Sequence, residues 1–254
     1  MAREMDDGVS PKDRFITVYG RNPVLEALAN DELLIDKVLL AERARGPHVQ
    51  DIVTAAHRRG AALQRVSAER VKKLAGNGKQ DQGVCADVVA PRMRPLERAL
   101  AEGLSGPVLV LDGITTPANV GMILRTATAA GFSGIVVPRR GVASLDPLVV
   151  KASAGVAFVA PVLKTATAAN AVHALRDRGF HVIGLAATAP MTLFDADLPG
   201  DTAYVLGSET AGLGGDVAAQ VQTWMSIPMA NEVESLNVAA AAAVLCFEVA
   251  RRAR

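Results

Sequence analysis

The segment Pro107-Val-Leu-Val-Leu-Asp-Gly-Ile-Thr-Thr-Pro-Ala-Asn-Val-Gly-Met-Ile-Leu-Arg125 decides the fold class of this chain. Its first six residues form a short apolar run that is typical of a buried parallel strand. Thr116 and Pro117 are typical of a helix N-cap followed by proline in the first turn. Apolar residues then recur at helical spacing, at Val120, Ile123, Leu124, Ala127 and Ala130. A strand followed at once by a helix is the repeating unit of an α/β sheet.

The same alternation continues to the C-terminus. The pattern predicts further strands over 134–138, 180–185, 203–206 and 223–227, and helices over 166–178 and 235–251. Residues 106–254 are therefore predicted to form one α/β domain with a mostly parallel sheet.

A smaller module precedes this domain. Short strands are predicted at 36–40, 61–66 and 83–89, with helices over 47–59 and 68–74. Residues 15–91 are thus predicted to form a small α/β domain. Residues 92–105 follow Pro91 and contain Pro95 and three arginines, a composition that favours a linker, and the polar residues 1–14 are expected to be disordered.

Composition narrows the class of protein. The chain has 254 residues, of which 50% are hydrophobic and 4% aromatic, so its core must consist of aliphatic side chains. The longest apolar stretch, about 12 residues from Val238, is too short to span a bilayer. Residues 1–14 lack the apolar core of an export signal. Cys85 and Cys246 are the only cysteines, which excludes a disulfide framework and favours the cytoplasm. The four histidines lack ligand spacing, so no metal site is expected.

Charge is unevenly distributed along the chain. The net charge is +1, yet residues 37–98 hold 13 Lys and Arg against 6 Asp and Glu, and the rest of the chain holds 14 against 20. Such asymmetry is typical of a module that faces nucleic acid, although an ordinary solvated surface gives the same count.

Three segments that follow predicted strands carry the candidate chemistry. In an open α/β sheet, ligands bind at the carboxyl ends of the strands. The first segment holds Asn119 and Gly121 at a strand-to-helix turn, with Arg125 off the apolar stripe of the helix. A capping asparagine and a surface arginine would give the same pattern.

The second segment, residues 205–215, is glycine-rich and contains Glu209. It has neither the G-x-G-x-x-G pattern of dinucleotide sites nor a Gly-Lys-Ser/Thr phosphate loop, which argues against an NAD-dependent oxidoreductase. The third segment, residues 227–247, contains Ser235, a natural N-cap, and Asn237, predicted to be buried because the following helix is apolar on every side. A buried amide needs a hydrogen-bond partner from the protein or from a ligand.

Together these segments resemble the three motifs of the SpoU (TrmH) family of SPOUT methyltransferases. The matching residues are Asn119-Val-Gly121 with Arg125, Gly207-Ser-Glu209, and Ile227-Pro-Met229 with Ser235-Leu-Asn237. Order and spacing both match. The stretch Tyr19-Gly-Arg-Asn-Pro-Val-Leu-Glu-Ala-Leu28 is similar to the opening of the ribosomal-protein-like RNA-binding domain in the subgroup that acts on 23S rRNA guanosine. Thr210, Asn231 and Ala239 depart from the family pattern, where two glycines and a serine are common.

The resemblance implies S-adenosyl-L-methionine as cofactor, bound in a deep trefoil knot of the C-terminal domain. It implies that five residues bind this cofactor: Leu206, Gly207, Ile227, Met229 and Leu236. A homodimer through the knot domain is also expected from the resemblance.

The implied reaction is methylation of a ribose 2′-hydroxyl in structured RNA. The resemblance assigns a catalytic part to five residues: Asn119, Arg125, Glu209, Ser235 and Asn237. Because a guanidinium is normally always charged, Arg125 acts either as a base whose pKa the site lowers strongly, or as an electrostatic clamp on phosphate or on the forming alkoxide. Neither role needs a metal.

The N-terminal module favours rRNA as the substrate, with Arg21 and Asn22 as weaker candidates for RNA contact. The alternatives are a tRNA ribose methyltransferase, a self-protection rRNA methyltransferase, and a catalytically idle RNA-binding relative.

Overall fold

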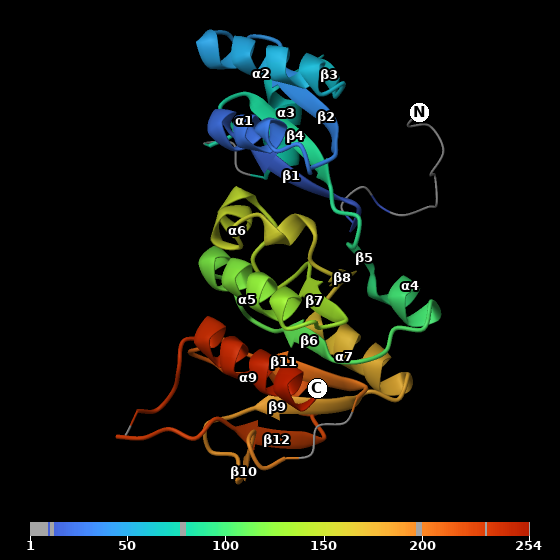
Figure 1. Cartoon of the computed structure of the whole chain (residues 1–254), viewed down its shortest axis with the longest axis vertical. Coiled ribbons are helices and arrows are strands. Elements are labelled where there is room, and N and C mark those ends of the chain that lie inside the picture. The colour runs from blue at the N-terminus through green and yellow to red at the C-terminus, as the bar shows by residue number, and fades with distance from the viewer. Residues whose placement is uncertain (1–9, 11–12, 77–79, 197–199, 232, 254) are drawn as a thin grey trace.

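The computed structural model describes residues 10, 13–76, 80–196, 200–231 and 233–253. It consists of a small domain stacked on a larger one, with helix α6 lying between the small domain and the rest of the larger one (Figure 1). Within the described residues, no helix combines the length and apolar character needed to cross a membrane.

The small domain contains a four-stranded mixed sheet. Its elements are β1 (Phe15–Tyr19), α1 (Arg21–Ala29), β2 (Ile35–Ala41), α2 (Pro47–Arg58), β3 (Ala62–Val66), α3 (Ala68–Ala75) and β4 (Val84–Val89). The strand order is β1-β4-β2-β3. β4 pairs antiparallel with β1 and β2, while β2 and β3 are parallel. The three strands and two helices predicted in this module are confirmed, whereas β1 and α1 were not predicted.

The large domain contains an eight-stranded sheet. Its strands are β5 (Arg94–Pro95), β6 (Val108–Leu111), β7 (Gly134–Pro138), β8 (Val162–Thr165), β9 (His181–Leu185), β10 (Met191–Thr192), β11 (Thr202–Leu206) and β12 (Thr223–Ser226). Its helices are α4 (Leu96–Ala101), α5 (Pro117–Ala129), α6 (Pro147–Ala152), α7 (Ala168–Asp177), α8 (Gly215–Ala218) and α9 (Val238–Arg252), with a 3-10 turn at Val156–Phe158.

All strand pairs of this sheet are parallel, as the sequence predicted. The strand order is β10-β12-β9-β11-β6-β7-β8-β5. From β6 the chain first proceeds through β7 to β8 on one side, and later returns to place β11 on the other side of β6. The order therefore reverses between β6 and β11, and such a switch point is where open α/β sheets bind ligands.

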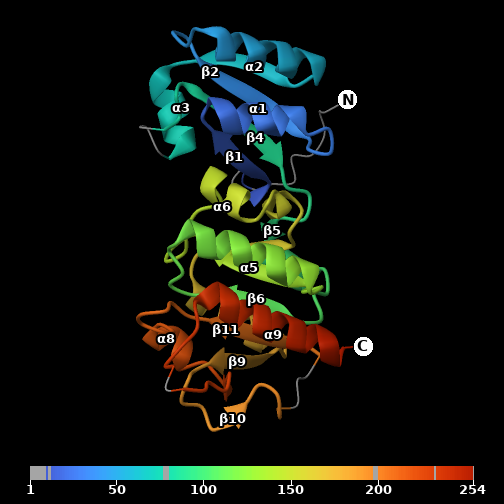
Figure 2. The same cartoon turned by 60° about the vertical axis from the view of Figure 1, so that its left-hand side comes forward.

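Helices cover both faces of the large sheet. Leu109 and Leu111 of β6 face a core shared with α5 and α9, while Val108 and Val110 of the same strand face a core shared with α4 and α7. This alternation is the two-residue period of a strand with both faces buried. Helices α5 and α9 pack side by side on their face (Figure 2).

The segment 92–105 differs from the predicted linker. It contains β5, which pairs with β8, and α4, whose Leu96, Ala99 and Leu100 are buried in the large domain. The spacing of these three apolar residues satisfies one face of a helix, and this signal outweighs the prolines, because Pro95 lies at the N-cap where it is tolerated.

The expected disorder of residues 1–14 falls largely outside the described residues. Asp13, which is described, is buried, and its carboxylate accepts hydrogen bonds from the Arg139 guanidinium at 2.5 and 2.6 Å. Nearby, burial and the charge of Arg139 lower the pKa of Lys164 to about 8. A charge pair therefore holds Asp13 against the large domain, and the expectation of disorder is wrong at this residue.

The two cysteines are free and buried, in agreement with the absence of a disulfide framework. Burial raises the pKa of both the Cys85 and the Cys246 thiol to about 12, so neither is a thiolate nucleophile.

Gly121 lies inside α5 rather than at the turn before it, because the helix begins at Pro117. Helix α6 approaches so closely that a Cβ on residue 121 would lie 2.6 Å from both the Ala152 Cβ and the Val149 carbonyl oxygen. Glycine is thus required here by packing.

We predict that Gly121→Ala destabilises the protein by about 1–3 kcal/mol, since α5 and α6 must separate. Gly215→Ala is the control, because a Cβ there meets nothing within 4 Å. Urea unfolding of both variants measures the difference, and equal stability of the two would contradict the close packing of α5 on α6.

Candidate functional site

One carboxylate oxygen joins the three predicted motifs. Oε1 of Glu209 accepts hydrogen bonds from Nδ2 of Asn119 at 3.0 Å, from Nδ2 of Asn237 at 2.6 Å and from the backbone N–H of Val238 at 3.0 Å. Nδ2 of Asn237 also donates to Oδ1 of Asn119 at 3.1 Å. We call these three side chains the Asn119–Glu209–Asn237 clasp.

The sheet topology explains this convergence. Asn119 lies in the first turn of α5, which follows β6, and Glu209 lies three residues after β11. β6 and β11 are neighbours whose order reverses at this point, so their carboxyl ends leave room between them. Asn237 reaches the same place as the N-cap residue of α9.

The structure corrects two details of the third motif. Asn237 is exposed rather than buried, and it, not Ser235, caps α9 by accepting hydrogen bonds from the backbone N–H groups of Ala239 and Ala240 at 2.9 and 3.4 Å. The helix therefore begins at Val238 instead of Ser235. Serine and asparagine are almost equally favourable N-cap residues. The cap lies at Asn237 because Glu209 accepts hydrogen bonds from both Asn237 and Val238.

Arg125 does not join the clasp. It lies on α5 six residues after Asn119, which is about 9 Å along the helix axis and about 120° around it. Its side chain is exposed and forms no hydrogen bond or ion pair with the described residues. Ser235 is likewise exposed and outside the clasp. The structure thus brings together three of the five predicted catalytic residues.

The five predicted cofactor residues lie in three segments, at the end of β11, after β12 and before α9. Leu206 ends β11, Gly207 follows it, Ile227 and Met229 follow β12, and Leu236 precedes α9. Leu206 is buried and the other four are half-buried. Half-buried aliphatic side chains beside loop backbone suit an adenosine moiety, which needs apolar walls and backbone hydrogen-bonding groups. These residues therefore fit the predicted cofactor.

The glycine-rich loop after β11 is folded tightly. A Cβ on Gly207 would lie 2.3 Å from the carbonyl carbon of Gly212, because Ser208 and Gly212 pair through two backbone hydrogen bonds. Asp112, which the sequence reasoning missed, fixes the far end of the loop: its Oδ2 accepts from the Gly214 N–H at 2.7 Å. An aspartate at the end of a buried strand was the available signal.

The backbone conformation at Asn231 explains one departure from the family pattern. Its φ of 56° lies in the left-handed region, where glycine is favoured and asparagine is among the few other residues tolerated. The loop conformation is thus compatible with asparagine. Ala239 is buried and Thr210 is exposed.

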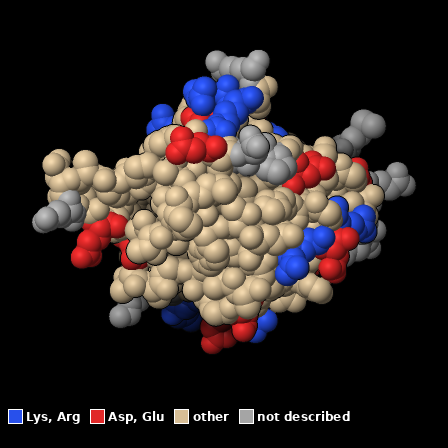
Figure 3. Space-filling model, turned by 90° about the horizontal axis from the view of Figure 1, so that it is seen from below, with Lys and Arg blue, Asp and Glu red and all other residues tan. Residues whose placement is uncertain are grey.

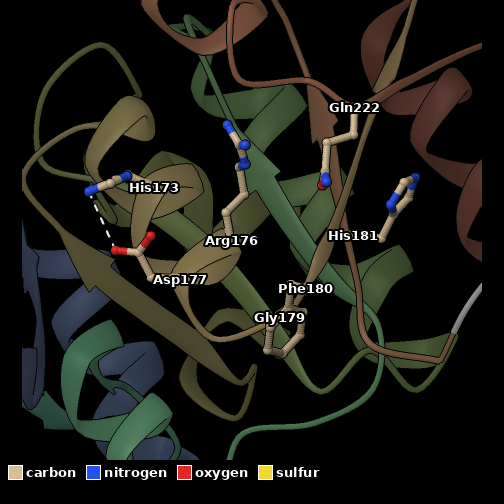
Figure 4. Close-up of a pocket in the computed structure, with 7 residues that line it drawn as sticks. All are labelled: His173, Arg176, Asp177, Gly179, Phe180, His181 and Gln222. Carbon is tan, nitrogen blue, oxygen red and sulfur yellow. Dashed lines mark ion pairs between the residues drawn. The ribbon is translucent and has the colours of Figure 1, made fainter.

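A cavity of about 380 Å³ lies at the opposite, amino edge of the sheet (Figure 4). Its lining consists of His173, Arg176, Asp177, Gly179, Phe180, His181 and Gln222. His173 pairs with Asp177 at 3.4 Å, and the ring of His181 bonds to the Thr223 hydroxyl at 2.8 Å. None of the predicted site residues reaches this cavity, so it is separate from the candidate site.

Within the described residues, no group of three His, Cys, Asp or Glu side chains is placed to hold a metal ion.

Two family models match the chain. The model of the SpoU rRNA Methylase family matches residues 106–247, and the model named RNA 2′-O ribose methyltransferase substrate binding matches residues 17–94. The chain belongs to the SpoU rRNA methylase family. Its two matched segments correspond to the two domains described above.

Curated relatives in the SpoU family resemble the whole chain. It is 34% identical to the 23S rRNA (guanosine-2′-O-)-methyltransferase RlmB of Ralstonia nicotianae, over 92% of this chain and 95% of the relative. It is equally similar, at 34% identity with the same coverage, to the Putative TrmH family tRNA/rRNA methyltransferase YacO of Bacillus subtilis.

Solved structures agree with this assignment. An AdoMet-bound rRNA methyltransferase from Sinorhizobium meliloti is 25% identical and superimposes with a TM-score of 0.63, over 94% of this chain and 88% of that one. A putative RNA methyltransferase of the TrmH family from Porphyromonas gingivalis is 27% identical, with a TM-score of 0.63 over 95% and 91%. The predicted SPOUT fold class is confirmed.

We predict that Glu209→Ala lowers the free energy of unfolding by about 1–2 kcal/mol, because three donors lose their shared acceptor at a partly solvated site. The amide of Val238 should also lose protection from hydrogen exchange. Glu234→Ala is the matched control, since it removes an exposed carboxylate from the neighbouring segment. Unchanged protection of Val238 in Glu209→Ala would show that the clasp does not hold α9.

Proposed function

We propose that this protein transfers a methyl group from S-adenosyl-L-methionine to a ribose 2′-hydroxyl of structured RNA, with 23S rRNA as the favoured substrate. The observation that carries the proposal is the Asn119–Glu209–Asn237 clasp at the switch point of the sheet, where Glu209 follows Gly207 by two residues and Asn237 follows Leu236 directly. Two of the relatives that match nearly the whole chain are named as 23S rRNA guanosine methyltransferases, which supports both the reaction and the substrate.

Leu206, Gly207, Ile227, Met229 and Leu236 would hold the cofactor, and the segments that contain them would form the trefoil knot. The bound cofactor supplies an electrophilic methyl group. The protein must then hold the ribose in line with it and assist loss of the hydroxyl proton, since a neutral hydroxyl is a poor nucleophile.

The clasp is placed to position the ribose. Glu209 accepts from both asparagine amides, so their orientation is fixed, and Oδ1 of Asn237 is occupied by the start of α9. Glu209 retains a second oxygen toward which a ribose hydroxyl can donate. Ser235 lies two residues before Asn237 in the chain and would complete the contacts with the sugar once RNA is bound.

Arg125 is exposed, and hydrated guanidinium groups stay charged. The electrostatic role is therefore the one that its surroundings support: Arg125 would bind a phosphate next to the target ribose, or stabilise the developing alkoxide.

The small domain would select the RNA. Two of its cations form ion pairs within the domain. Lys37 pairs with Asp36 and Asp87 at 3.0 Å, and Arg59 pairs with Asp31 and donates to backbone carbonyls. The exposed cations of the small domain include Arg43, Arg58, Arg65, Arg70, Lys72 and Lys73. These can bind phosphates.

The opposite end of the molecule contributes little to such binding. Figure 3 views it from the side of β10 and β12, and its centre is uncharged, with Lys and Arg confined to the margin. RNA phosphates would therefore be drawn toward the small domain instead.

A tRNA substrate is the second candidate. One solved structure, which is described as giving insight into methylation of C/U34 on tRNA, is 29% identical to this chain with a TM-score of 0.52. It covers only 59% of this chain. The small domain, which matches the substrate-binding model, is the feature that favours rRNA. Action on rRNA also implies the cytoplasm as the location.

We also propose a homodimer through α5 and α9. These adjacent helices expose Met122 and Phe247, at 41% and 53% of their surfaces. Arg125 lies one turn after Met122 on the same side of α5, so a second copy seated here would cover the helix face next to Arg125.

The test uses purified protein, radiolabelled S-adenosyl-L-methionine and separate pools of unmodified 23S rRNA transcript and tRNA, followed by nucleoside analysis. We expect 2′-O-methylated nucleoside from the rRNA pool, and at least a hundredfold slower transfer by Arg125→Ala with unchanged cofactor binding. Label only in tRNA would overturn the substrate assignment. Cofactor binding without transfer to either pool would refute the proposed reaction, and full activity of Arg125→Ala would refute the role of the arginine.

Phe247→Glu should convert the dimer to a monomer in sedimentation analysis, because a charge would be buried at the interface. Phe194→Glu is the matched control, since Phe194 is 47% exposed near β10, away from α5 and α9. Dissociation by the control alone would place the interface at β10, and a monomeric wild-type protein would rule out the dimer.

A further inference from the structure

A cavity of about 310 Å³ lies between the small domain and α6. Tyr19, Asn22, Gln80 and Gln82 line it from the small domain, and Pro147 and Leu148 line it from α6. This space is large enough for a nucleobase, and neither the cofactor residues nor the clasp contributes to it.

The two sides of the cavity are joined by a direct contact. The hydroxyl of Tyr19 donates to Oδ2 of Asp146 at 3.5 Å. Oδ1 of the same aspartate accepts from the N–H groups of Leu148 and Val149 at 2.9 and 3.0 Å, and so caps α6. The wall from α6 is thus fixed at the residue that touches the small domain.

The chemistry of the lining is unusual for an RNA-binding domain rich in cations. None of the described residues that line the cavity is charged, whereas three of them, Asn22, Gln80 and Gln82, carry a side-chain amide. An amide offers a donor and an acceptor side by side, as does the edge of a base. Phosphate, in contrast, is bound by Arg and Lys. The cavity is therefore suited to a base rather than to the RNA backbone.

Gln82 is held in an orientation that presents its amide. Its Oε1 accepts from the Arg21 N–H at 3.0 Å, which leaves the Nε2 hydrogens as donors. Its backbone φ is 49°, in the left-handed region that non-glycine residues rarely adopt. Asp81, beside it, fixes the turn by accepting from the Gly83 N–H at 2.8 Å.

Two buried polar atoms in the segments that line the cavity have no partner among the described residues: Nε of Arg21 and Oδ2 of Asp81, although neither residue lines the cavity itself. Both residues are chain neighbours of lining residues, and Asp81 is only 5% exposed. Unpaired buried polar atoms are costly and rare, and a bound water, ion or ligand that completes the hydrogen bonding is one of the explanations for them.

The cavity also lies on the same side of the molecule as the clasp. α5 and α6 begin after β6 and β7, so their amino ends lie at the carboxyl edge of the sheet, where the clasp is. Helix α6 separates the small domain from α5 in both views (Figures 1 and 2). The cavity and the clasp therefore lie toward the same edge of the sheet, as contact of one RNA substrate with both requires.

We propose that this cavity binds one unpaired nucleobase of the RNA substrate, other than that of the methylated nucleotide, through the amides of Asn22 and Gln82. The proposal rests on the proposed function in so far as the substrate is RNA. Sequence-specific RNA recognition uses unstacked bases in this way.

The test measures filter binding of unmodified 23S rRNA transcript to the full-length protein at one salt concentration. Asn22→Ala removes one amide. Gln82→Glu keeps the oxygen that accepts from Arg21 but removes the donor, and Gln50→Glu adds the same charge elsewhere on the small domain. Gln64→Ala is the control for Asn22→Ala. Gln50 and Gln64 are both exposed and outside the cavity.

We expect Asn22→Ala and Gln82→Glu each to weaken binding about tenfold relative to its control, with unchanged affinity for S-adenosyl-L-methionine and an unchanged melting temperature. Binding equal to the controls would overturn the proposal. So would weaker RNA binding accompanied by a lower melting temperature, since that result indicates a structural role.

Methyl transfer by the wild-type protein is measured in parallel on the same transcript. Binding without transfer would refute the proposed reaction, while the comparison of variants would still decide on the cavity. A wild-type protein that does not bind the transcript would refute both.

Discussion

The three motifs depend on a single acceptor, the Oε1 atom of Glu209. Its three donors come from Asn119, Asn237 and Val238, which are 90, 28 and 29 residues away in the chain. Hydrogen bonds to a charged acceptor are stronger than those between neutral groups. Because one donor is the backbone amide at the start of α9, the carboxylate determines where that helix begins. It therefore fixes the glycine-rich loop, the long segment before α9 and the first turn of α5 relative to one another.

Much of this arrangement follows from local patterns in the sequence. The apolar run over 108–111 and the helical spacing after Pro117 predicted β6 and α5, and similar signals predicted β7, β9, β11 and β12. Parallel strands bring their carboxyl ends to one edge, so polar residues that follow different strands converge. Asn119 and Glu209 could be placed together for this reason, although their separation in sequence is large.

Other features depend on contacts that no local pattern contains. Ser235 and Asn237 have similar cap preference, and the choice between them is made by Glu209. Gly121 is a glycine because α6 lies against it, not because a turn requires one. The helix α4 was missed because Pro91 and Pro95 suggested a linker, while the burial of Leu96 depends on a sheet formed by distant residues. The distance of Arg125 from the clasp follows from helix geometry only once the first residue of α5 is known.

The cations of the small domain are fewer in their effect on RNA than the sequence count suggests. Lys37 and Arg59 are engaged in ion pairs within the fold, so the excess of basic residues in this segment overstates the charge that RNA can meet. Attraction to phosphate is independent of sequence, and more of it would strengthen binding to every RNA equally. Selection of one site must come from uncharged groups that distinguish bases or from the fit of the RNA shape. A moderately charged small domain leaves room for such discrimination, and Tyr19 joins it to α6 through a neutral hydroxyl that donates to the Asp146 carboxylate.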